Sequence, residues 1–537
     1  MLPEAHDYAV LRDAFRWRVP ETYNIGVDVC DRWAGAEPHR LALIHLAADG
    51  AVREYRFGEL RRLANRVANL FRHHGIGRGQ RVGILLAQAP ETALAHLAVY
   101  RMGAVAVPLF SLFGSDALAY RLGNCGATAV VTDNAGLEKL SAIREALPKL
   151  ATVFNIDGAG DGAVDFHAEL ARASDVFTPV VTRAEDPALI IYTSGTTGQP
   201  KGALHAHRVL LGHLPGVEMS HDFLGAPGDC LWTPADWAWI GGLLDVLMPA
   251  WHHGIPVVAH RFGKFDPQAA LALMARFGVR NTFLPPTALK LMRAVENPPP
   301  GLRLRSVASG GESLGETLLH WGRRVLGVTI NEFYGQTECN MIVSSSARLG
   351  LTRPGRMGRA VPGHDLAIID DAGQPVAAGV QGHIAVRRPD PVMFLEYWDN
   401  PDATRAKFIQ DWLVTGDVGE MDDDGYIRFV GRDDDVITSG GYRIGPGEIE
   451  DCLITHPAVR MAAAVGMPDE LRTEIVRAYV VLESGWAGDE ALKTQIQRHV
   501  RERLAAHEYP REVVFIDELP MTTTGKVMRR VLRERGR

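Results

Sequence analysis

A chain of 537 residues is longer than a single hydrophobic core usually organises, so we expect two or more domains. Its apolar content of 46% and charged content of 23% are typical of a globular protein. The formal net charge of −7 argues against nucleic acid as a main partner.

The N-terminus and the cysteines indicate the compartment. The first residues, MLPEAHDYAV, lack the basic start and apolar core of a signal peptide, and no apolar run approaches about 18 residues. The five cysteines are scattered, without the spacing of a zinc site. We therefore expect free thiols, no membrane span and a cytoplasmic location.

Apolar runs alternate with helical patterns in the first part of the chain. A helix is expected at 90–102, and a Gly/Asp-rich loop at 157–165. The expected strands are 81–86, 103–108, 128–132 and 188–192. This alternation predicts βαβ units and a largely parallel sheet, and so an α/β fold.

The rest of the chain divides into three stretches. Residues 202–214 are expected to be helical, and 231–251 are rich in tryptophan, which is more often core than ligand wall. Further strands are expected at 255–259, 281–284 and 305–308. From 351 onward, short strands separated by Gly and Asp turns predict a β subdomain. Beyond 433 the pattern predicts a small α+β domain of about 100 residues.

One loop has the composition of a phosphate-binding site. Residues 192–202, YTSGTTGQPKG, follow a short apolar run of the buried-strand type. Small residues let the backbone approach a ligand, and N–H groups, hydroxyls and Lys201 can meet phosphate oxygens. The spacing is not the Walker pattern, and an ordinary Gly/Thr-rich surface loop is the alternative.

Four later motifs could serve the same ligand. YGQTE at 334–338 carries a carboxylate that could hold Mg²⁺. TGD at 415–417, followed by Gly431-Arg432, could bind ribose hydroxyls and phosphate. The others are DDVITSGGYRIGPGEIE at 434–450 and PMTTTGK at 520–526. Each of them alone is equally well explained as an exposed turn.

Together and in this order, the five motifs resemble those of the acyl-adenylate-forming superfamily of AMP-binding acyl-CoA synthetases, and they look most like its medium-chain members. The resemblance covers nearly the whole chain. It implies a large N-terminal domain of βαβ layers with a β subdomain at 1–432. It also implies a small, mobile α+β C-terminal domain at 433–537, with the hinge near Asp434.

The resemblance implies a two-step ligation that uses ATP, Mg²⁺ and CoA. A carboxylate attacks the α-phosphate of ATP to give acyl-AMP and pyrophosphate, and the thiol of CoA then displaces AMP. Lys526 would lie between the carboxylate and the α-phosphate, and Glu338 would hold Mg²⁺. Thr337 and Arg443 match two further catalytic positions. Such a reaction depends chiefly on positioning and charge neutralisation.

The remaining matched positions divide by ligand. Those implied for the nucleotide are Thr193, Ser194, Gly195, Thr196, Thr197, Gly198, Lys201, Gly311, Glu312, Glu332, Phe333, Tyr334, Gly335, Gln336, Asp417 and Arg432. Those implied for CoA are Gly440, Gly441, Tyr442 and, as a weaker candidate, Arg472. Those implied for the acyl pocket are Trp237, Trp239, Gly310 and Gly335.

The nature of the acid is open at this point. Acetate-specific relatives carry a Trp just before the Gln of the YGQTE-like motif, and that Trp blocks the acyl pocket. Gly335 stands there in this chain, so we expect a pocket that reaches past two carbons. Such a pocket would suit a medium-chain fatty acid or a flat aromatic acid, and a range of substrates is expected because discrimination per methylene is weak.

Two alternatives concern the acceptor and the class of protein. The acceptor could be the phosphopantetheine of a carrier protein, and Glu508 departs from the Lys that relatives often carry near CoA. The second alternative is a different class of protein, one that binds a nucleotide without catalysing a reaction. The presence of all five expected polar side chains argues against it, namely Lys201, Glu338, Asp417, Arg432 and Lys526. Both a monomer and a homodimer are compatible with the sequence.

Overall fold

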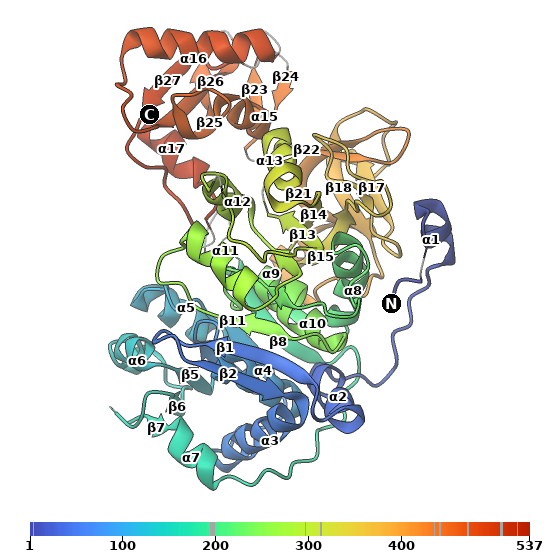
Figure 1. Ribbon diagram of the computed structural model, residues 1–537, viewed down its shortest axis with the longest axis vertical. Coiled ribbons are helices and arrows are strands. Elements are labelled where there is room, and N and C mark those ends of the chain that lie inside the picture. Colours follow the sequence, from blue (N-terminus) through green and yellow to red (C-terminus); the bar gives the residue numbers. More distant parts are fainter. Residues whose placement is uncertain are drawn as a thin grey trace.

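The computed structural model describes residues 1–537 except 4, 161, 194–198, 296, 312–313, 434, 440–441, 470–471, 505–508, 523–524 and 537. For 438, 442, 443 and 448 it describes the backbone alone. Figure 1 shows a large part built from the N-terminal residues, with a smaller C-terminal part resting on it. None of the helices in the described ranges is long and apolar enough to cross a membrane.

The first sheet of the large part carries the predicted phosphate loop. In spatial order its strands are β19 (Glu396–Tyr397), β9 (Lys201–Ala206), β8 (Pro187–Thr193), β4 (Val105–Pro108), β3 (Arg81–Leu85), β5 (Ala129–Thr132), β6 (Thr152–Asn155) and β7 (Val164–Asp165). Strands from β8 to β7 run parallel, as the βαβ pattern predicts. The associated helices are α3 (Phe57–His73), α4 (Pro90–Arg101), α5 (Ser115–Cys125), α6 (Asn134–Ser141) and α7 (Phe166–Arg172).

The second sheet joins distant segments. In spatial order its strands are β16 (Arg359–Ala360), β15 (Cys339–Ser344), β14 (Ile330–Gln336), β13 (Ser306–Gly310), β12 (Asn281–Phe283), β10 (Leu231–Trp232), β11 (Val257–Ala259), β1 (Leu41–Leu46) and β2 (Val52–Arg56). Its helical segments include α8 (Val209–Ser220), α9 (Ile240–Gly242), η3 (Leu243–Leu247), α10 (Met248–His252), α11 (Pro267–Arg276), α12 (Pro286–Met292), α13 (Glu316–Trp321) and η4 (Gly322–Leu326). A hydrophobic core connects elements of both sheets.

The expected β subdomain and the small C-terminal domain are both present. The subdomain contains β17 (Leu366–Ile369), β18 (Gly382–Arg387), β20 (Phe408–Ile409), β21 (Trp412–Met421) and β22 (Ile427–Arg432), with α14 (Pro401–Ala406) nearby. The C-terminal sheet contains β23 (Ile437–Ser439), β24 (Tyr442–Ile444), β25 (Val459–Asp469), β26 (Thr473–Leu482) and β27 (Glu512–Phe515). Its helices are α15 (Pro446–Leu453), α16 (Glu490–Arg503) and α17 (Arg529–Arg535).

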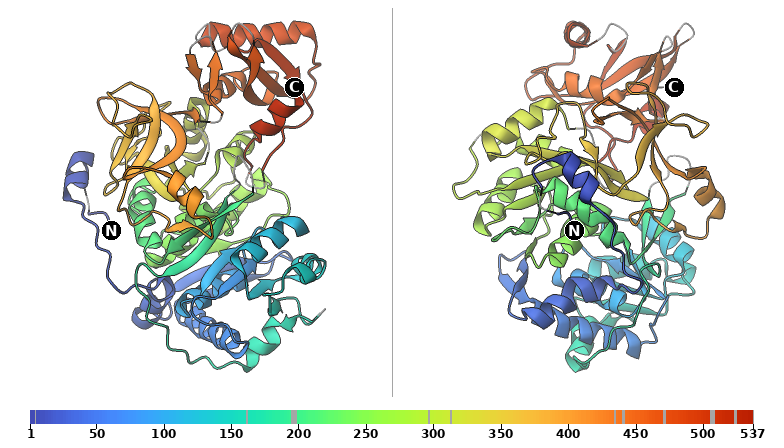
Figure 2. Two further views of the ribbon diagram at one scale, coloured as in Figure 1. Left: turned by 180° about the vertical axis from the view of Figure 1, so that it is seen from behind. Right: turned by 90° about the vertical axis from the view of Figure 1, so that its right-hand side faces the viewer.

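Short segments complete the fold. Near the N-terminus these are α1 (Tyr8–Ala14), η1 (Val27–Asp31) and α2 (Arg32–Ala36), and η2 (Arg144–Ala146) follows α6. In both views of Figure 2 the α1 segment lies beside the large part. The α/β prediction and the division into a large and a small unit are therefore confirmed.

The helix predicted at 202–214 is wrong for its first half. Residues 201–206 form strand β9, which pairs antiparallel with β8, and the helix α8 begins only at Val209. The pairing places Gly202 opposite Tyr192, and a Cβ on Gly202 would come 2.8 Å from Ile190 Cγ2. The short run Gly-Ala-Leu-His-Ala at 202–206 does not distinguish helix from strand, so the pairing across the loop decided the outcome.

The tryptophan-rich stretch is mainly core, as its composition favoured. Trp232, Trp237 and Trp251 are fully buried, and the indole of Trp251 donates to the carbonyl of Ala42 at 2.7 Å. Trp239 differs because it is only half-buried, at the edge of the same core.

Candidate active site

The predicted phosphate loop connects the two arms of the β8–β9 hairpin. Thr193 and Lys201 are its described ends, and they face each other in the strand pairing. Ser194, Gly195, Thr196, Thr197 and Gly198 lie outside the described residues.

Helix α5 holds both ends of this loop. The Tyr120 hydroxyl donates to the carbonyl of Pro200 at 3.0 Å. The Tyr192 hydroxyl donates to Asn124 Oδ1 at 2.6 Å, and the Arg121 guanidinium lies 5.8 Å from the Tyr192 ring. Sequence reasoning missed this support, because Tyr120 and Pro200 are far apart in the chain and no local pattern links them.

Glu338 lies beside the loop and is oriented by a tyrosine. It is buried in the turn region that follows β14, next to Thr337, and its Oε1 accepts a short hydrogen bond from the Tyr397 hydroxyl. The Lys201 ammonium lies 5.3 Å from the centre of the Tyr397 ring, within cation–π range. Tyr397 thus connects the loop cation with the motif carboxylate, and the sequence analysis did not single it out.

The surroundings of Glu338 fit a magnesium ion. No group of three or more metal-ligating side chains occurs in the described part of the chain. Mg²⁺ does not need one, since it usually binds one or two carboxylates and completes its shell with substrate phosphates and water. The second carboxylate oxygen of Glu338 accepts no hydrogen bond from the described residues. One oxygen is therefore oriented and the other is available.

Tyr334 and Asp417 form the next pair, and they join the YGQTE and TGD motifs. The Tyr334 hydroxyl donates to Asp417 Oδ2 at 2.6 Å, and Gln336 Nε2 donates to the carbonyl of Thr415 at 2.8 Å. Burial raises the pKa of Asp417, opposed by this hydrogen bond and then by the charge of Arg432. Arg432 stands directly opposite Asp417 in the pairing of β21 with β22.

The end of β13 approaches the same place. Gly311 has φ +100°, a conformation that favours glycine, and a Cβ there would lie 3.6 Å from the Trp239 ring. A Cβ on Gly310 would collide with the Phe333 ring at 2.6 Å. The absence of side chains at these two glycines therefore allows aromatic rings to pack against the strand end. Glu312 lies outside the described residues.

Glu332 has a structural contact that the sequence did not indicate. It is buried, and its Oε1 accepts a hydrogen bond from the backbone N–H of Leu314 at 3.2 Å. Burial raises the pKa of Glu332 to about 8, and this hydrogen bond opposes the rise. The carboxyl therefore holds the turn that follows β13.

Lys526 reaches this site from the C-terminal domain. It follows Gly525 on a tight turn in which its backbone N–H donates to Thr522 Oγ1 at 3.0 Å. Thr287 Oγ1, in the large domain, donates to the Gly525 carbonyl at 3.3 Å. Lys526 Cε lies 3.9 Å from the position of a Cβ on Gly311, and the lysine charge opposes the rise that burial causes in the pKa of Asp417. Figure 1 shows this segment descending from the small sheet toward α12.

The hairpin that carries Tyr442, matched to CoA, and Arg443, matched to a catalytic position, is not brought to this place. Tyr442 and Arg443 belong to the β23–β24 hairpin, where Arg443 pairs with Thr438 and Tyr442 with Ser439. Arg472 is exposed beside that hairpin, because its neighbour Thr473 pairs with Ser439. In Figures 1 and 2 the hairpin lies on the small sheet, away from the tip that carries Lys526. Gly440, Gly441 and the hinge candidate Asp434 lie outside the described residues.

The region of the expected acyl pocket holds a residue that sequence reasoning missed. Trp237 is fully buried, and its indole N–H has no partner among the described residues. Trp239 packs against Phe283, with ring centroids 5.5 Å apart. A Cβ on Gly335 would lie 2.5 Å from Asn340 Oδ1, so the Asn340 side chain stands where a larger residue at 335 would project.

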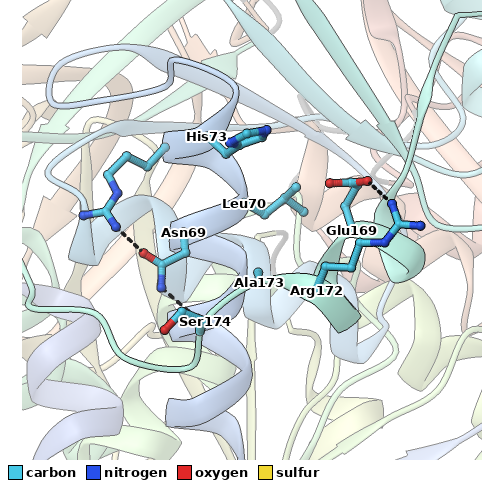
Figure 3. Close-up of a pocket in the computed structure, with 8 residues that line it drawn as sticks. Asn69, Leu70, His73, Glu169, Arg172, Ala173 and Ser174 are labelled. Atoms are coloured by element: carbon cyan, nitrogen blue, oxygen red, sulfur yellow. Dashed lines mark hydrogen bonds and ion pairs between the residues drawn. The ribbon is translucent and has the colours of Figure 1, made fainter.

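A separate surface pocket contains none of these residues (Figure 3). It encloses about 420 Å³ between α3 and α7. Its lining residues are Asn69, Leu70, Arg72, His73, Glu169, Arg172, Ala173 and Ser174. Arg72 donates to Asn69 Oδ1 at 2.7 Å and Arg172 to Glu169 Oε1 at 2.9 Å, so both guanidinium groups are already paired.

Two protein-family models match this chain, one in each part of it. The AMP-binding enzyme family matches residues 30–398, and the AMP-binding enzyme C-terminal domain matches residues 448–526. The mouse protein Acyl-coenzyme A synthetase ACSM4, mitochondrial, is 35% identical over 531 residues, which cover 96% of this chain and 91% of that protein.

Solved structures are similar over nearly the whole length. Anthranilate CoA ligase AuaEII, in complex with anthranoyl-AMP, is 30% identical with a TM-score of 0.88, covering 96% of this chain and 98% of its own. MatB from Rhodopseudomonas palustris is also 30% identical, covering 95% and 98%, with TM-scores of 0.84 for its ATP-bound structure and 0.76 for its apo structure. The chain therefore superposes better on the ATP-bound form of that protein.

The family follows from two of these findings. One family model matches more than half of the chain, and one relative aligns with nearly all of it. The chain belongs to the AMP-binding acyl-CoA synthetase superfamily, and it is an AMP-forming acid–CoA ligase.

Proposed function

We propose that this structure corresponds to the adenylate-forming state of an acyl-CoA synthetase, with Lys526 as the principal catalytic residue. The observation that carries the proposal is the position of Lys526 beside Gly311, reached from the other domain. A cation there can neutralise the repulsion between an anionic carboxylate and the α-phosphate of ATP.

In the first step the acid's carboxylate oxygen forms a bond to the α-phosphorus, and the bond from that phosphorus to pyrophosphate breaks. Thr193 to Lys201 would bind the β- and γ-phosphates, with Tyr334 and Gly311 beside adenine and Asp417 and Arg432 on the ribose. Mg²⁺, held by Glu338, would neutralise phosphate charge when bound. The buried contacts Tyr334–Asp417 and Tyr397–Glu338 support these roles, because they fix the side chains before ATP arrives.

In the second step the CoA sulfur forms a bond to the acyl carbon, the bond from that carbon to AMP breaks, and the thiol proton is released. We propose that the domain 433–537 turns about Asp434 for this step, removes Lys526 and brings Gly440, Gly441 and Tyr442 to the thiol. The distance of the β23–β24 hairpin from the Lys526 tip supports this proposal (Figure 1). Arg472 would contact the CoA nucleotide after the turn. Arg443 lies on the β23–β24 hairpin, so the phosphate contact expected for it is not part of the adenylate-forming arrangement proposed here.

For the acid, we propose a chain or ring longer than acetate, with medium-chain fatty acids first and aromatic acids as the second candidate. The aromatic packing of Trp239 on Phe283 supports an apolar wall for either acid, while Asn340 lies in the space beside Gly335. The similarity to a ligase solved with anthranoyl-AMP favours testing aromatic acids as well.

The five free, buried cysteines support a reducing compartment such as the cytoplasm.

A panel of acids tests this function. We expect pyrophosphate release from ATP to be stimulated by some acids of four to twelve carbons or by aromatic acids, and to give thioester only when CoA is added. Pyrophosphate should be measured by a coupled assay and thioester by mass spectrometry. Thioester formed on a carrier protein but not on CoA would favour the alternative acceptor, and release that no acid stimulates would contradict the proposal.

Replacing Tyr397 by Phe should weaken the magnesium dependence without disturbing the fold. The change removes the hydroxyl that orients Glu338, and loss of such an outer contact typically costs about 10- to 100-fold in metal affinity or activity. Calorimetric titration of ATP at several Mg²⁺ concentrations, together with pyrophosphate release, measures the effect. Tyr479→Phe is the matched control, since that buried hydroxyl donates to the carbonyl of Leu532 within the small domain and does not contact Glu338. Equal behaviour of the two variants would refute the orienting role.

A further inference from the structure

Three buried polar side chains form a connected group behind Gly335. Asn340 Nδ2 donates to both carboxylate oxygens of Asp245, at 2.8 and 3.0 Å. His213 Nδ1 lies 3.0 Å from Asp245 Oδ1. The residues come from β15, η3 and α8, and each is at most 4% exposed. Nothing in the two-step reaction requires this group.

The group fixes the direction of the Asn340 amide. A carboxylate accepts hydrogen bonds and cannot donate them, so the NH₂ group must face Asp245 and the amide oxygen must face away. That oxygen, Oδ1, points at Gly335, 2.5 Å from the position of a Cβ there. The described residues provide no donor to it. Burial raises the pKa of Asp245, while the bonds from His213 and Asn340 oppose the rise and favour the ionised acceptor.

The amide oxygen therefore faces the side of Gly335 on which a larger residue would enter the acyl pocket. In a side chain that is only 4% exposed, an acceptor without a protein donor is unfavourable, and a ligand that supplies the donor removes that penalty. An alkyl chain cannot supply it, whereas a hydroxyl or an amino group can.

We propose that Asn340 Oδ1, held by Asp245 and His213, is a specificity-determining contact of the acyl pocket that selects acids carrying a hydrogen-bond donor on the chain or ring. The inference rests on the proposed function, because it takes Gly335 as part of the acyl pocket. Asn340 occupies the space beside Gly335, and its amide oxygen gives that side of the acyl pocket a polar surface.

Matched pairs of acids test the inference in the full-length enzyme. Hexanoate is compared with 6-hydroxyhexanoate, and benzoate with its 2-amino, 3-amino and 3-hydroxy derivatives, by kcat/KM for pyrophosphate release. We expect the wild type to prefer the donor-bearing acid in at least one pair by about tenfold or more, since a site built to bond a donor rejects the analogue lacking it. Asn340→Leu, similar in shape but without the amide, should lose that preference, chiefly through KM.

The controls separate polarity from packing. Met341→Leu changes the neighbouring residue on β15, which contacts α8 at Gly216, and should keep the wild-type preference. Asn340→Ala provides a second variant if the leucine variant does not fold, and it should lose the preference too. An unchanged ratio in a folded Asn340 variant, or no preference in the wild type, overturns the inference and leaves the proposed function standing. No pyrophosphate release with any acid overturns both.

Discussion

Replacing Lys526 by Ala should lower pyrophosphate release by at least about 10²- to 10³-fold, the loss seen when a group that stabilises transition-state charge is removed. The lysine lies on the C-terminal tip, and its side chain reaches Gly311 at the end of β13. The same variant should still convert supplied acyl-AMP and CoA to thioester, because that step does not use the cation in our proposal. The two half-reactions are measured separately, by pyrophosphate release and by thioester formation.

The neighbouring basic helix offers a matched control for this prediction. Arg530 is exposed on α17, and its one partner among the described residues is Glu534 of the same helix, at 3.6 Å, so Arg530→Ala should leave both half-reactions near wild type. Equal loss of both half-reactions in Lys526→Ala would contradict the proposal that Lys526 acts in the adenylate-forming state and not in the thioester-forming state.

Replacing Gly445 by Ala should shift the enzyme away from the adenylate-forming arrangement. Gly445 precedes α15 in the small domain, and a Cβ there would lie 1.9 Å from the carbonyl oxygen of Val430 on β22. That contact belongs to the backbone, so the two segments must separate. Overpacking of this kind costs about 1–3 kcal/mol, which corresponds to about a 5- to 150-fold shift between states. We therefore expect pyrophosphate release to fall by that factor.

Thioester formation from supplied acyl-AMP should fall much less in Gly445→Ala, because it uses the other arrangement in our proposal. Gly35→Ala is the control, since a Cβ at Gly35 meets nothing within 4 Å. Thermal unfolding of both variants establishes that they are folded. A Gly445→Ala enzyme with wild-type pyrophosphate release would show that the β22 contact is not needed for adenylation.

The local signals in the sequence were reliable where short stretches decide the structure. Strands such as Val105–Pro108 and the helix Pro90–Arg101 follow from apolar runs, a proline at the helix start and glycine turns. The run 202–206 was misassigned, because its composition suits helix and strand alike and only the hairpin with β8 distinguishes them.

The contacts that support the site could not be predicted in the same way. Tyr120 reaches Pro200 from helix α5, Tyr397 reaches Glu338 from strand β19, and Asn340 fills the space beside Gly335. Each contact joins residues whose types are ordinary at their own positions. These contacts can be recognised only when sheet order and strand register have brought the elements together.

The sequence by itself determined the family, the two-domain α/β plan and the chemical groups of the reaction, because five motifs keep their order and their functional residue types. The tertiary structure decided which of those groups meet. It brings Lys526 to Gly311, keeps the β23–β24 hairpin away, and turns the amide of Asn340 toward Gly335. The physical reason is that side-chain chemistry is local to the sequence, whereas proximity and burial depend on long-range packing.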